Sequence, residues 1–399
     1  MSEWKLKDCC ISISDGDHLP PPKVDDGIPF ITISNINSSN QIDFQNTLFV
    51  PREYYENLDK IRKPIINDIL YSVVGSFGKA VLVKNFKEFV FQRHIAILRP
   101  NPDVVIPSYL YYVMSSKQFY YKADTVAIGA AQRTISLTSL RNMIVNLPPI
   151  KTQHNIAEIL SRYDSLIENY QKQIKLLEES AQRLYKEWFV DLRFPRHENT
   201  KIVDGVPEGW SYMKIKDRYK TVLGGTPSRS INNYWGGDIS WINSGELNKL
   251  RIINPSEKIT IDGYNNSSTK LMPIHTTILA ITGATLGQVS YTEIETCANQ
   301  SVVGIIDEKN TTNEYLYLNI YNNIHSMINK ATGGAQQHIN KDIVNDYCIM
   351  LPNEDILTEF RKKIKPVFNA IRNYLFTIEK LTEARDRLLP KLMSGEIEV

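Results

Sequence analysis

The chain has 399 residues, 42% of them apolar and 23% charged, and its formal net charge is +2. This length predicts two or more domains, because single cores seldom grow so large. No run approaches the roughly 18 apolar residues of a membrane span and the first residues lack the pattern of a signal peptide, so we expect a cytoplasmic protein without a membrane partner. The four cysteines (Cys9, Cys10, Cys297, Cys348) match neither metal-ligand spacing nor a disulfide framework, which predicts reduced thiols and no metal site.

Residues 1–150 predict a mixed, mostly β domain, in which short apolar runs alternate with Gly, Pro, Asn and Asp. One helix is predicted at residues 108–121, with Ser108 as its N-cap. The pair Pro148-Pro149 then ends the domain.

Residues 152–188 predict one long helix that begins at Thr152 and belongs to a spacer segment of residues 151–198. Apolar side chains recur at alternating steps of four and three residues, which is the a/d repeat of a coiled-coil seam. The predicted seam positions are Ile156, Leu160, Tyr163, Ile167, Tyr170, Ile174, Leu177, Ala181, Leu184 and Trp188.

Residues 199–352 predict a second β-rich domain that repeats the first. A strand followed by a glycine-rich turn occurs at residues 66–78 and again at 274–287, with one residue more in the second copy. A second glycine turn occurs at residues 129–135 and 333–339, and we match Gln92 with Gln300.

Residues 353–399 predict a second long helix, because the seam returns after a shift of 204 residues. Arg385 is a polar exception in this seam, and Pro366 is expected to kink the helix or delay its start. The repeated positions are Phe360, Ile364, Val367, Ile371, Tyr374, Ile378, Leu381, Leu388 and Leu392.

The chain is therefore predicted to be an α+β tandem duplication, in which each domain precedes a long helix. We expect the two helices to form an antiparallel, pseudo-twofold coiled coil with the domains at opposite ends. A helix of this length spans about 55 Å at ~1.5 Å per residue. That distance corresponds to about 16 base pairs at ~3.4 Å each.

The sequence shows no catalytic pattern. It contains no Walker loop, no Gly-x-Gly-x-x-Gly and no pattern of a nucleophile or of paired carboxylates, which favours a binding role. Basic and acidic residues are nearly balanced in every segment, whereas nucleic-acid-binding proteins usually carry a basic excess. If the chain binds DNA, either its basic side chains cluster on one face or a partner supplies phosphate contacts.

Base recognition requires hydrogen-bonding side chains on exposed turns, and the repeated turns supply them with different residues in the two halves. Because both copies keep Gln132 and Gln336, these two residues fit local backbone bonding equally well. The candidate DNA-binding residues are His18, Lys79, Gln132, Arg133, Thr134, Thr226, Ser228, Arg229, Gln288, Gln336, Gln337 and His338.

The duplicated plan resembles the DNA-specificity subunit of type I restriction-modification systems. The resemblance covers essentially the whole chain, and its motifs are specific only in combination. They are residues 15–18 (DGDH), 27–36 (GIPFITISNI), 224–247 (GGTPSRSINNYWGGDISWINSGEL), the turns at 129–135 and 333–339, and the helix endings at 183–195 (RLYKEWFVDLRFP) and 387–397 (RLLPKLMSGEI).

The resemblance implies two target recognition domains that each recognise one half of a bipartite double-stranded DNA sequence, with the coiled coil setting the gap. It implies docking of two methyltransferase subunits for adenine methylation in phage defence, and it leaves open two restriction or motor subunits. This chain would be non-catalytic and hold no cofactor, since S-adenosylmethionine, ATP and Mg²⁺ would be bound by the partners. Trp188 and Phe189 are expected to dock a methyltransferase, because large aromatic side chains often dominate interfaces.

Two alternatives remain open at this stage. The first is a coiled-coil adaptor or dimerisation protein that binds proteins rather than DNA, and the second is an enzyme with an unrecognised site. DNA binding that weakens steeply with salt would argue against the adaptor.

Overall fold

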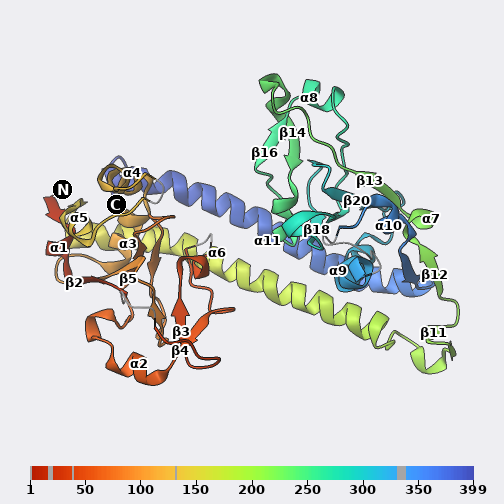
Figure 1. Ribbon diagram of the computed structural model, residues 1–399, viewed down its shortest axis with the longest axis horizontal. Coiled ribbons are helices and arrows are strands. Elements are labelled where there is room, and N and C mark those ends of the chain that lie inside the picture. The colour runs from red at the N-terminus through yellow and green to blue at the C-terminus, as the bar shows by residue number, and fades with distance from the viewer. Residues whose placement is uncertain (1, 17–20, 38–39, 131–132, 330–337) are drawn as a thin grey trace. The chain divides into compact units, whose positions relative to one another are not determined.

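The structure is a computed structural model, and it describes residues 2–16, 21–37, 40–130, 133–329 and 338–399. These residues form two compact units. Unit 1 comprises Met1–Ile167 and Lys380–Val399, and unit 2 comprises Glu168–Glu379. Each unit therefore contains one predicted domain and a part of each long helix (Figure 1).

Unit 1 is built around a four-stranded antiparallel sheet in the order β2-β8-β5-β6. In a second sheet, β3 pairs antiparallel with β4 and parallel with β7, and β1 pairs with β9. The strands are β1 Ser2–Lys5, β2 Cys10–Asp15, β3 Ile28–Ile31, β4 Leu48–Val50, β5 Ile69–Ser72, β6 Ala80–Leu82, β7 Val90–Phe91, β8 Ile95–Pro100 and β9 Ile144–Leu147. The helices of the domain are α1 Leu6–Cys9, α2 Arg52–Asn57, α3 Pro107–Ser115, α4 Lys117–Val126 and α5 Leu137–Asn142, with 3-10 turns η1 Ile33–Asn35 and η2 Lys60–Arg62.

Unit 2 repeats these sheets. Its main sheet has the order β13-β20-β17-β18-β15, and its second sheet pairs β14 antiparallel with β16 and parallel with β19. The strands are β10 Ile202–Val203, β11 Val206–Pro207, β12 Ser211–Lys214, β13 Lys220–Leu223, β14 Trp235–Ile242, β15 Arg251–Ile252, β16 Glu257–Ile259, β17 Thr277–Ala280, β18 Val289–Thr292, β19 Cys297–Ala298, β20 Val302–Ile306 and β21 Cys348–Leu351. The helices are α7 Ile215–Arg218, α8 Ile261–Asn265, α9 Asn313–Asn329 and α10 Lys341–Asp346, with 3-10 turns η4 His197–Asn199, η5 Asn232–Tyr234, η6 Ser244–Asn248 and η7 Gly283–Thr285.

The strand registers confirm the predicted duplication. Ser2 pairs with Leu147 in unit 1, and Ser211 pairs with Leu351 in unit 2. The central strands β5 and β17 are buried at every position, because each lies in the middle of its sheet between packed layers. Unit 2 has a further edge strand, β15, beside β18, and the described residues of unit 1 form no counterpart of it.

The predicted helix at residues 108–121 is two helices, α3 and α4, and the predicted cap is wrong. The first begins at Pro107, a residue suited to the first helical position. The second begins after Ser116, whose side chain accepts a hydrogen bond from the Phe119 N–H.

The long helices are α6, Ile150–Tyr185, and α11, Glu354–Ser394. The first begins two residues before the predicted Thr152, since the Pro149 carbonyl already accepts the Gln153 N–H. Pro366 does not delay the start of α11, which begins at Glu354. Proline has no N–H, so the Lys362 carbonyl loses its helical partner, but both residues are exposed and water can reach that carbonyl.

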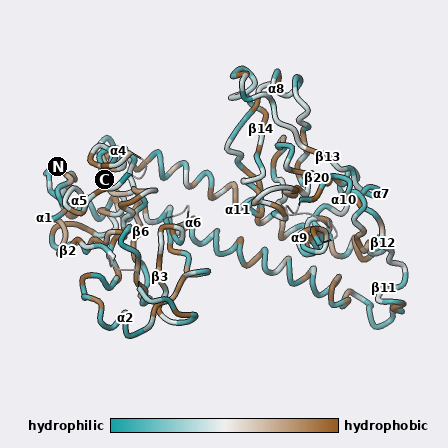
Figure 2. The backbone as a smooth tube through the Cα atoms, in the orientation of Figure 1, coloured by the Kyte–Doolittle hydropathy of each residue, from teal (hydrophilic) through white to brown (hydrophobic). Residues whose placement is uncertain are grey.

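Hydrophobic and hydrophilic residues alternate along both long helices (Figure 2), and every predicted seam position is buried or half-buried. The helices run antiparallel in both units. In unit 1, Ile156 and Leu160 share a core with Leu388 and Leu392, and in unit 2 the Trp188 and Phe360 ring centroids are 5.7 Å apart.

Tyr170 and Tyr374 are equivalent residues of the two helices, and they touch each other in unit 2. Their ring centroids are 4.9 Å apart. Antiparallel equivalent helices bring a residue against its own counterpart only at the centre of their pairing. This contact therefore agrees with the predicted pseudo-twofold pairing of the helices.

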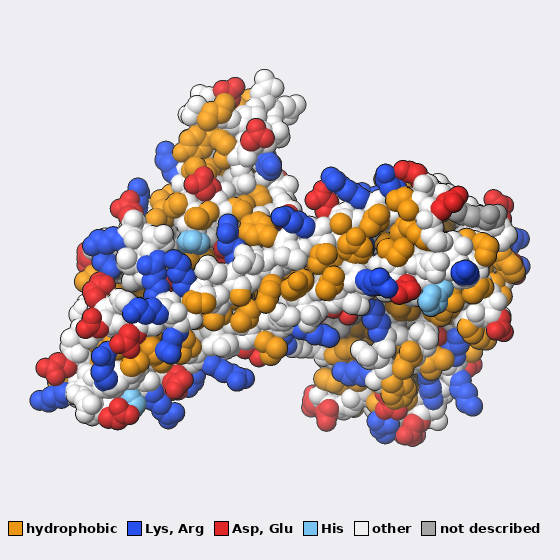
Figure 3. Space-filling model, turned by 180° about the vertical axis from the view of Figure 1, so that it is seen from behind, with side chains coloured by type: hydrophobic (Ala, Val, Ile, Leu, Met, Phe, Trp, Pro, Cys, Tyr) orange, Lys and Arg blue, Asp and Glu red, His pale blue; other side chains and the backbone are white. Residues whose placement is uncertain are grey.

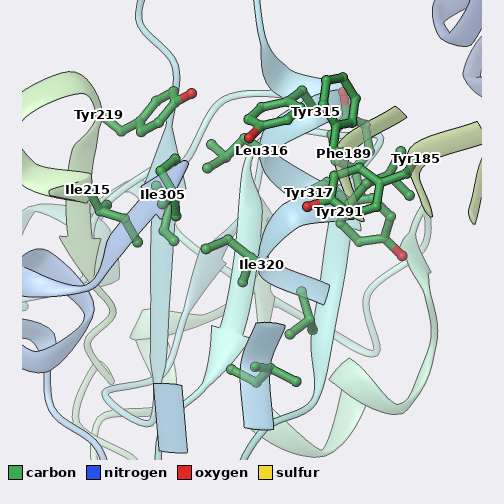
Figure 4. Close-up of a cluster of buried hydrophobic side chains, with 14 of the residues drawn as sticks. Tyr185, Phe189, Ile215, Tyr219, Tyr291, Ile305, Tyr315, Leu316, Tyr317 and Ile320 are labelled. Carbon is green, nitrogen blue, oxygen red and sulfur yellow. The ribbon is translucent and has the colours of Figure 1, made fainter. Parts of the chain in front are cut away.

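The core of unit 2 joins the domain to α6 (Figure 4), and Phe360 and Ile364 of α11 belong to the same core. Tyr185 and Phe189 pack with Tyr315 beside the main sheet. A π-helical turn, η3 Lys186–Val190, follows α6 and turns both Trp188 and Phe189 inward, where each is 5% exposed. The prediction that these two residues dock a methyltransferase is therefore wrong, because they are core residues.

The two chain termini meet in unit 1 (Figure 1). Trp4, Met393 and Ile397 all pack against the same apolar core. Both ends of the chain therefore contribute to the core of unit 1.

Candidate nucleic-acid interface

The candidate residues of unit 1 come together where β5 and β2 end and where β6 and β8 begin. The Ile135 N–H donates to the Val73 carbonyl at 2.8 Å, and the Gly75 N–H donates to the Arg133 carbonyl at 3.0 Å. The two glycine turns, far apart in sequence, therefore lie side by side. They bring Lys79, Arg133 and the neighbouring Thr134 to one end of the sheet.

Two more loops meet at the same end of the sheet. The Val73 N–H donates to the His94 carbonyl at 2.8 Å, which places the β7–β8 loop beside the first turn. At Gly16, a Cβ atom would lie 2.2 Å from the Phe91 carbonyl oxygen, so only glycine lets the segment after β2 approach.

Among the described residues, unit 2 repeats three of these contacts. The Ile339 N–H donates to the Ile281 carbonyl, and the Ile281 N–H donates to the Ser301 carbonyl. At Gly224, a Cβ atom would lie 2.1 Å from the Asn299 carbonyl oxygen. The four-loop end of the sheet is thus the part of each domain where the candidate residues gather.

These contacts correct the alignment of the repeat by one residue. The Gln92 and Asn299 carbonyls both accept the N–H of the residue three places on, Ile95 or Val302. Gln92 therefore corresponds to Asn299 rather than to Gln300.

The equivalent residue of Gln300 is Arg93. Both are exposed, they lie on the same loop of the two domains, and they differ in chemistry. The sequence comparison missed this pair because a shift of one residue matched Gln92 with Gln300 instead.

The two cations predicted in unit 1 are held by their own domain. The Lys79 ammonium donates to the Ile36 carbonyl at 3.2 Å. The Arg133 guanidinium donates to the Asp124 and Ala127 carbonyls at the end of α4, and it pairs with the Asp124 carboxylate at 2.5 Å. Both side chains shape the turns, so Arg93 is the exposed cation of this surface that the sequence analysis did not select.

Three of the residues predicted in unit 2, Thr226, Ser228 and Arg229, lie on the segment after β13. The Thr226 hydroxyl donates to the Gln300 carbonyl oxygen at 2.5 Å, and the Ser228 and Ser230 hydroxyls are 2.8 Å apart. The Arg229 guanidinium carbon lies 3.6 Å from the Trp235 ring centroid, and an NH group lies 2.7 Å from a Glu257 carboxylate oxygen. This arginine is 55% exposed and is held flat by the indole.

Two other predicted residues of unit 2, Gln288 and His338, lie on other loops. The Gln288 side-chain oxygen is buried and has no hydrogen-bond partner among the residues that the structure covers. His338 is exposed beside Ile339. The remaining candidates, His18, Gln132, Gln336 and Gln337, lie outside the described residues.

A groove of about 1000 Å³ runs along the edge strand β13 and ends at Gln300. Lys220, Lys270 and Lys341 line it, and Lys220 pairs with Glu308 at 3.1 Å. The sequence did not reveal this group, because its lysines are far apart in the chain. Asp307 and Glu308 line the groove as well, so its charges are mixed, like those on the face shown in Figure 3.

His94 adds no positive charge to its loop at neutral pH. Burial lowers the pKa of its imidazole below the ordinary 6.5, and the neighbouring Arg93 lowers it further. No group of His, Cys, Asp and Glu side chains suited to a metal ion occurs among the described residues, and no helix in that part is long and apolar enough to cross a membrane.

Comparison with known proteins identifies the class. Residues 3–179 and 207–382 each match the type I restriction modification DNA specificity domain. The chain therefore belongs to this family and carries two copies of its domain. This membership supports sequence-specific DNA recognition and disfavours the adaptor alternative.

Two relatives and one solved structure agree with this assignment. The chain is 25% identical over 397 residues to the type I restriction enzyme HindI specificity subunit of Haemophilus influenzae, covering 83% of this chain and 86% of that protein. It is 26% identical over 411 residues to the putative type I restriction enzyme MjaX specificity subunit of Methanocaldococcus jannaschii, covering 100% and 94%. The S subunit of the type I system from M. genitalium has the same fold, with a TM-score of 0.61 at 14% identity, covering 98% and 95%.

Proposed function

We propose that each domain recognises one half of a bipartite DNA sequence and that the paired helices set the gap between the halves. The observation that carries this proposal is the four-loop surface, where the described residues of both domains make matching backbone contacts and carry different side chains. Arg93 in the first domain corresponds to Gln300 in the second, and Lys79 corresponds to Gln288. Recognition of two different half-sites requires the same backbone framework in both domains and different side chains to contact the bases.

Arg93 and Arg229 are the side chains best suited to contact bases. Arginine donates two hydrogen bonds to guanine in the major groove. The indole of Trp235 holds the Arg229 plane in place, so DNA need only replace Glu257 as the partner of its N–H groups. Lys270 and Lys341 are suited to phosphate contact along the groove.

The chain would act as a non-catalytic cytoplasmic subunit. It would dock two methyltransferase subunits, and restriction or motor subunits could join them for phage defence. S-adenosylmethionine, ATP and Mg²⁺ would be held by those partners. In this working division, residues 1–150 and 199–352 recognise DNA, and residues 151–198 and 353–399 form the spacer.

The test is to co-express the chain with its methyltransferase partner and to map methylated adenines across the host genome. We expect a bipartite motif with a fixed gap that disappears when this chain is omitted. An active methyltransferase in a confirmed complex that produces no such motif would contradict the proposal.

A further inference from the structure

A buried group of charges joins the second domain to both long helices. Arg251, on β15, is 5% exposed, and its Nε donates to a Glu178 carboxylate oxygen at 2.8 Å. A second nitrogen of Arg251 donates to Glu293 at 3.2 Å, and Arg372 approaches the other Glu293 oxygen at 3.5 Å. We name these four residues the Arg251 cluster. Arg251 and Glu293 belong to the domain, Glu178 to α6 and Arg372 to α11.

Aromatic rings enclose the Arg251 guanidinium on its remaining sides. Its central carbon lies 4.0 Å from the Phe368 ring centroid, 4.9 Å from that of Tyr291 and 5.1 Å from that of Tyr317. The domain and α11 both contribute these rings. The arginine therefore keeps its ion pairs and its ring contacts together only while the domain and both helices keep their present alignment.

Unit 1 has a smaller group of the same kind. The Tyr112 hydroxyl, on α3, donates to one Asp164 carboxylate oxygen at 2.7 Å. Arg385, on α11, donates to the other oxygen at 2.8 Å. We name these three residues the Asp164 cluster. It explains the polar residue in the predicted seam, because Arg385 neutralises a carboxylate of α6 that is 8% exposed.

The two clusters were not copied with the repeat. The shift of 204 residues that relates the helices takes Asp164 to Phe368 and Arg385 back to Ala181. Phe368 is the ring beneath Arg251, and Ala181 lies close in sequence to Glu178. Charges thus occupy the same level of the helix pair in both units, on different residues.

A heptad seam alone does not fix alignment, because a slip of seven residues again places apolar side chains against each other. Buried charges penalise such a slip, since any misalignment leaves a charge without its partner. We infer that the Arg251 and Asp164 clusters are positioning residues that fix each domain on the helix pair, and thereby the number of base pairs tolerated between the half-sites. This inference rests on the proposed function.

The test uses the full chain in complex with its methyltransferase. The variant Glu178→Gln/Arg251→Met/Glu293→Gln removes the charges with similar side-chain volumes and leaves no lone buried charge. The control Glu383→Gln/Arg387→Met neutralises an exposed pair on α11. Methylation rates are measured on duplexes that carry both half-sites at the native gap and at gaps one or two base pairs longer or shorter.

We expect the variant to lose about tenfold or more of the preference for the native gap, because misaligned states no longer strand a buried charge. The control should keep the wild-type preference. An unchanged preference, or an equal loss of rate at every gap with a lower unfolding midpoint, would overturn the inference.

Tyr112→Phe tests unit 1 with a smaller change, because it removes one hydroxyl at the Asp164 cluster and leaves the ion pair of Asp164 with Arg385. We expect a reduced gap preference and a small fall in the unfolding midpoint, because a buried carboxylate oxygen loses one hydrogen bond. An unchanged gap preference would count against a positioning role for this cluster. If the wild-type chain shows no half-site preference at all, the proposed function fails. If the wild-type chain is specific but its variants keep the same gap preference, only the inference fails.

Discussion

The edge strands β2 and β13 occupy the same place in the two domains, but only the first is covered. In unit 1, η2 lies against β2, and the segment is held by Arg99 on β8. Arg99 donates to the Lys63 carbonyl at 2.9 Å and pairs with the buried Asp68 at 2.9 Å. In unit 2 the equivalent of Arg99 is Ile306, which lines the open groove along β13.

The difference shows how one sheet supports two surfaces. The segment between the short helix and the central strand has the same length in both domains, so chain length does not decide whether the edge is covered. The pair of Arg99 and Asp68 decides whether the edge is covered, because Arg99 donates to backbone carbonyls of the segment, whereas the equivalent Ile306 offers no hydrogen bond. Apolar cores keep the fold, and polar contacts at its edges are free to change.

The largest expected effect comes from breaking the pair that covers the edge. Arg99→Ile should destabilise unit 1 by about 3–5 kcal/mol, because it leaves Asp68 buried without its partner. Denaturant unfolding measures the loss, and hydrogen exchange should show residues 59–66 opening.

The matched double variant sharpens the comparison. Asp68→Thr/Arg99→Ile installs the residues of unit 2, Thr276 and Ile306, and removes the unpaired charge. Much of the stability should return while residues 59–66 stay open to exchange. A double variant as unstable as the single one would show that this pair does not explain the difference.

A second prediction concerns the exposed arginines of the two four-loop surfaces. Arg93→Ala should relax one position of one half-site, and Arg229→Ala should relax one position of the other, each by about 1–3 kcal/mol of discrimination. Methylation of duplex libraries measures both. Loss of specificity in the same half-site from both variants would contradict the division of labour.

The smallest effect is expected at Asp307, which follows β20. Burial raises the pKa of its carboxyl, but hydrogen bonds from Thr312 and from the Thr311 and Lys309 N–H groups outweigh burial and hold it below the ordinary 3.8. The stabilisation is therefore present above pH 4 and is lost as the pH falls through the depressed value. Asp307→Asn should cost about 1 kcal/mol at pH 7.

The pH dependence separates the two units. Unit 1 has Pro100 in the place of Asp307, so only unit 2 should show this contribution. Unfolding of wild type and Asp307→Asn is compared at pH 7 and pH 3. A difference that grows on acidification would contradict the assigned direction.

Much of the fold follows from periodicity and repetition in the sequence. The seam from Ile156 to Trp188 predicts a helix and its buried face, since helical spacing is set by geometry alone. The repeated glycines predict the first turn of each domain, and Gly78 and its counterpart Gly287 there adopt a positive φ that favours glycine. The antiparallel pairing was expected from the resemblance, and the structure confirms it by the contacts of Leu160 with the Leu388 region and of Trp188 with Phe360.

The site was predicted less fully, because the two repeats were aligned one residue out of register and because the sequence does not show side-chain hydrogen bonds. The match between Gln92 and Gln300 was one residue out, and backbone hydrogen bonds were needed to pair Arg93 with Gln300. Lys79 and Arg133 are predicted DNA contacts, and the structure adds that both donate to backbone carbonyls of their own domain, which the sequence did not show. Trp188 and Phe189 are adjacent in sequence, and only a π-helical turn buries both.

The central claim is that each domain independently recognises one half-site. Its most direct test is to replace residues 1–150 by the first domain of another family member, up to the Ile150 start of α6, and to map methylated adenines with the methyltransferase present. One half of the motif should change, while the other half and the gap stay the same. A motif that changes in both halves, or in neither, would contradict the account.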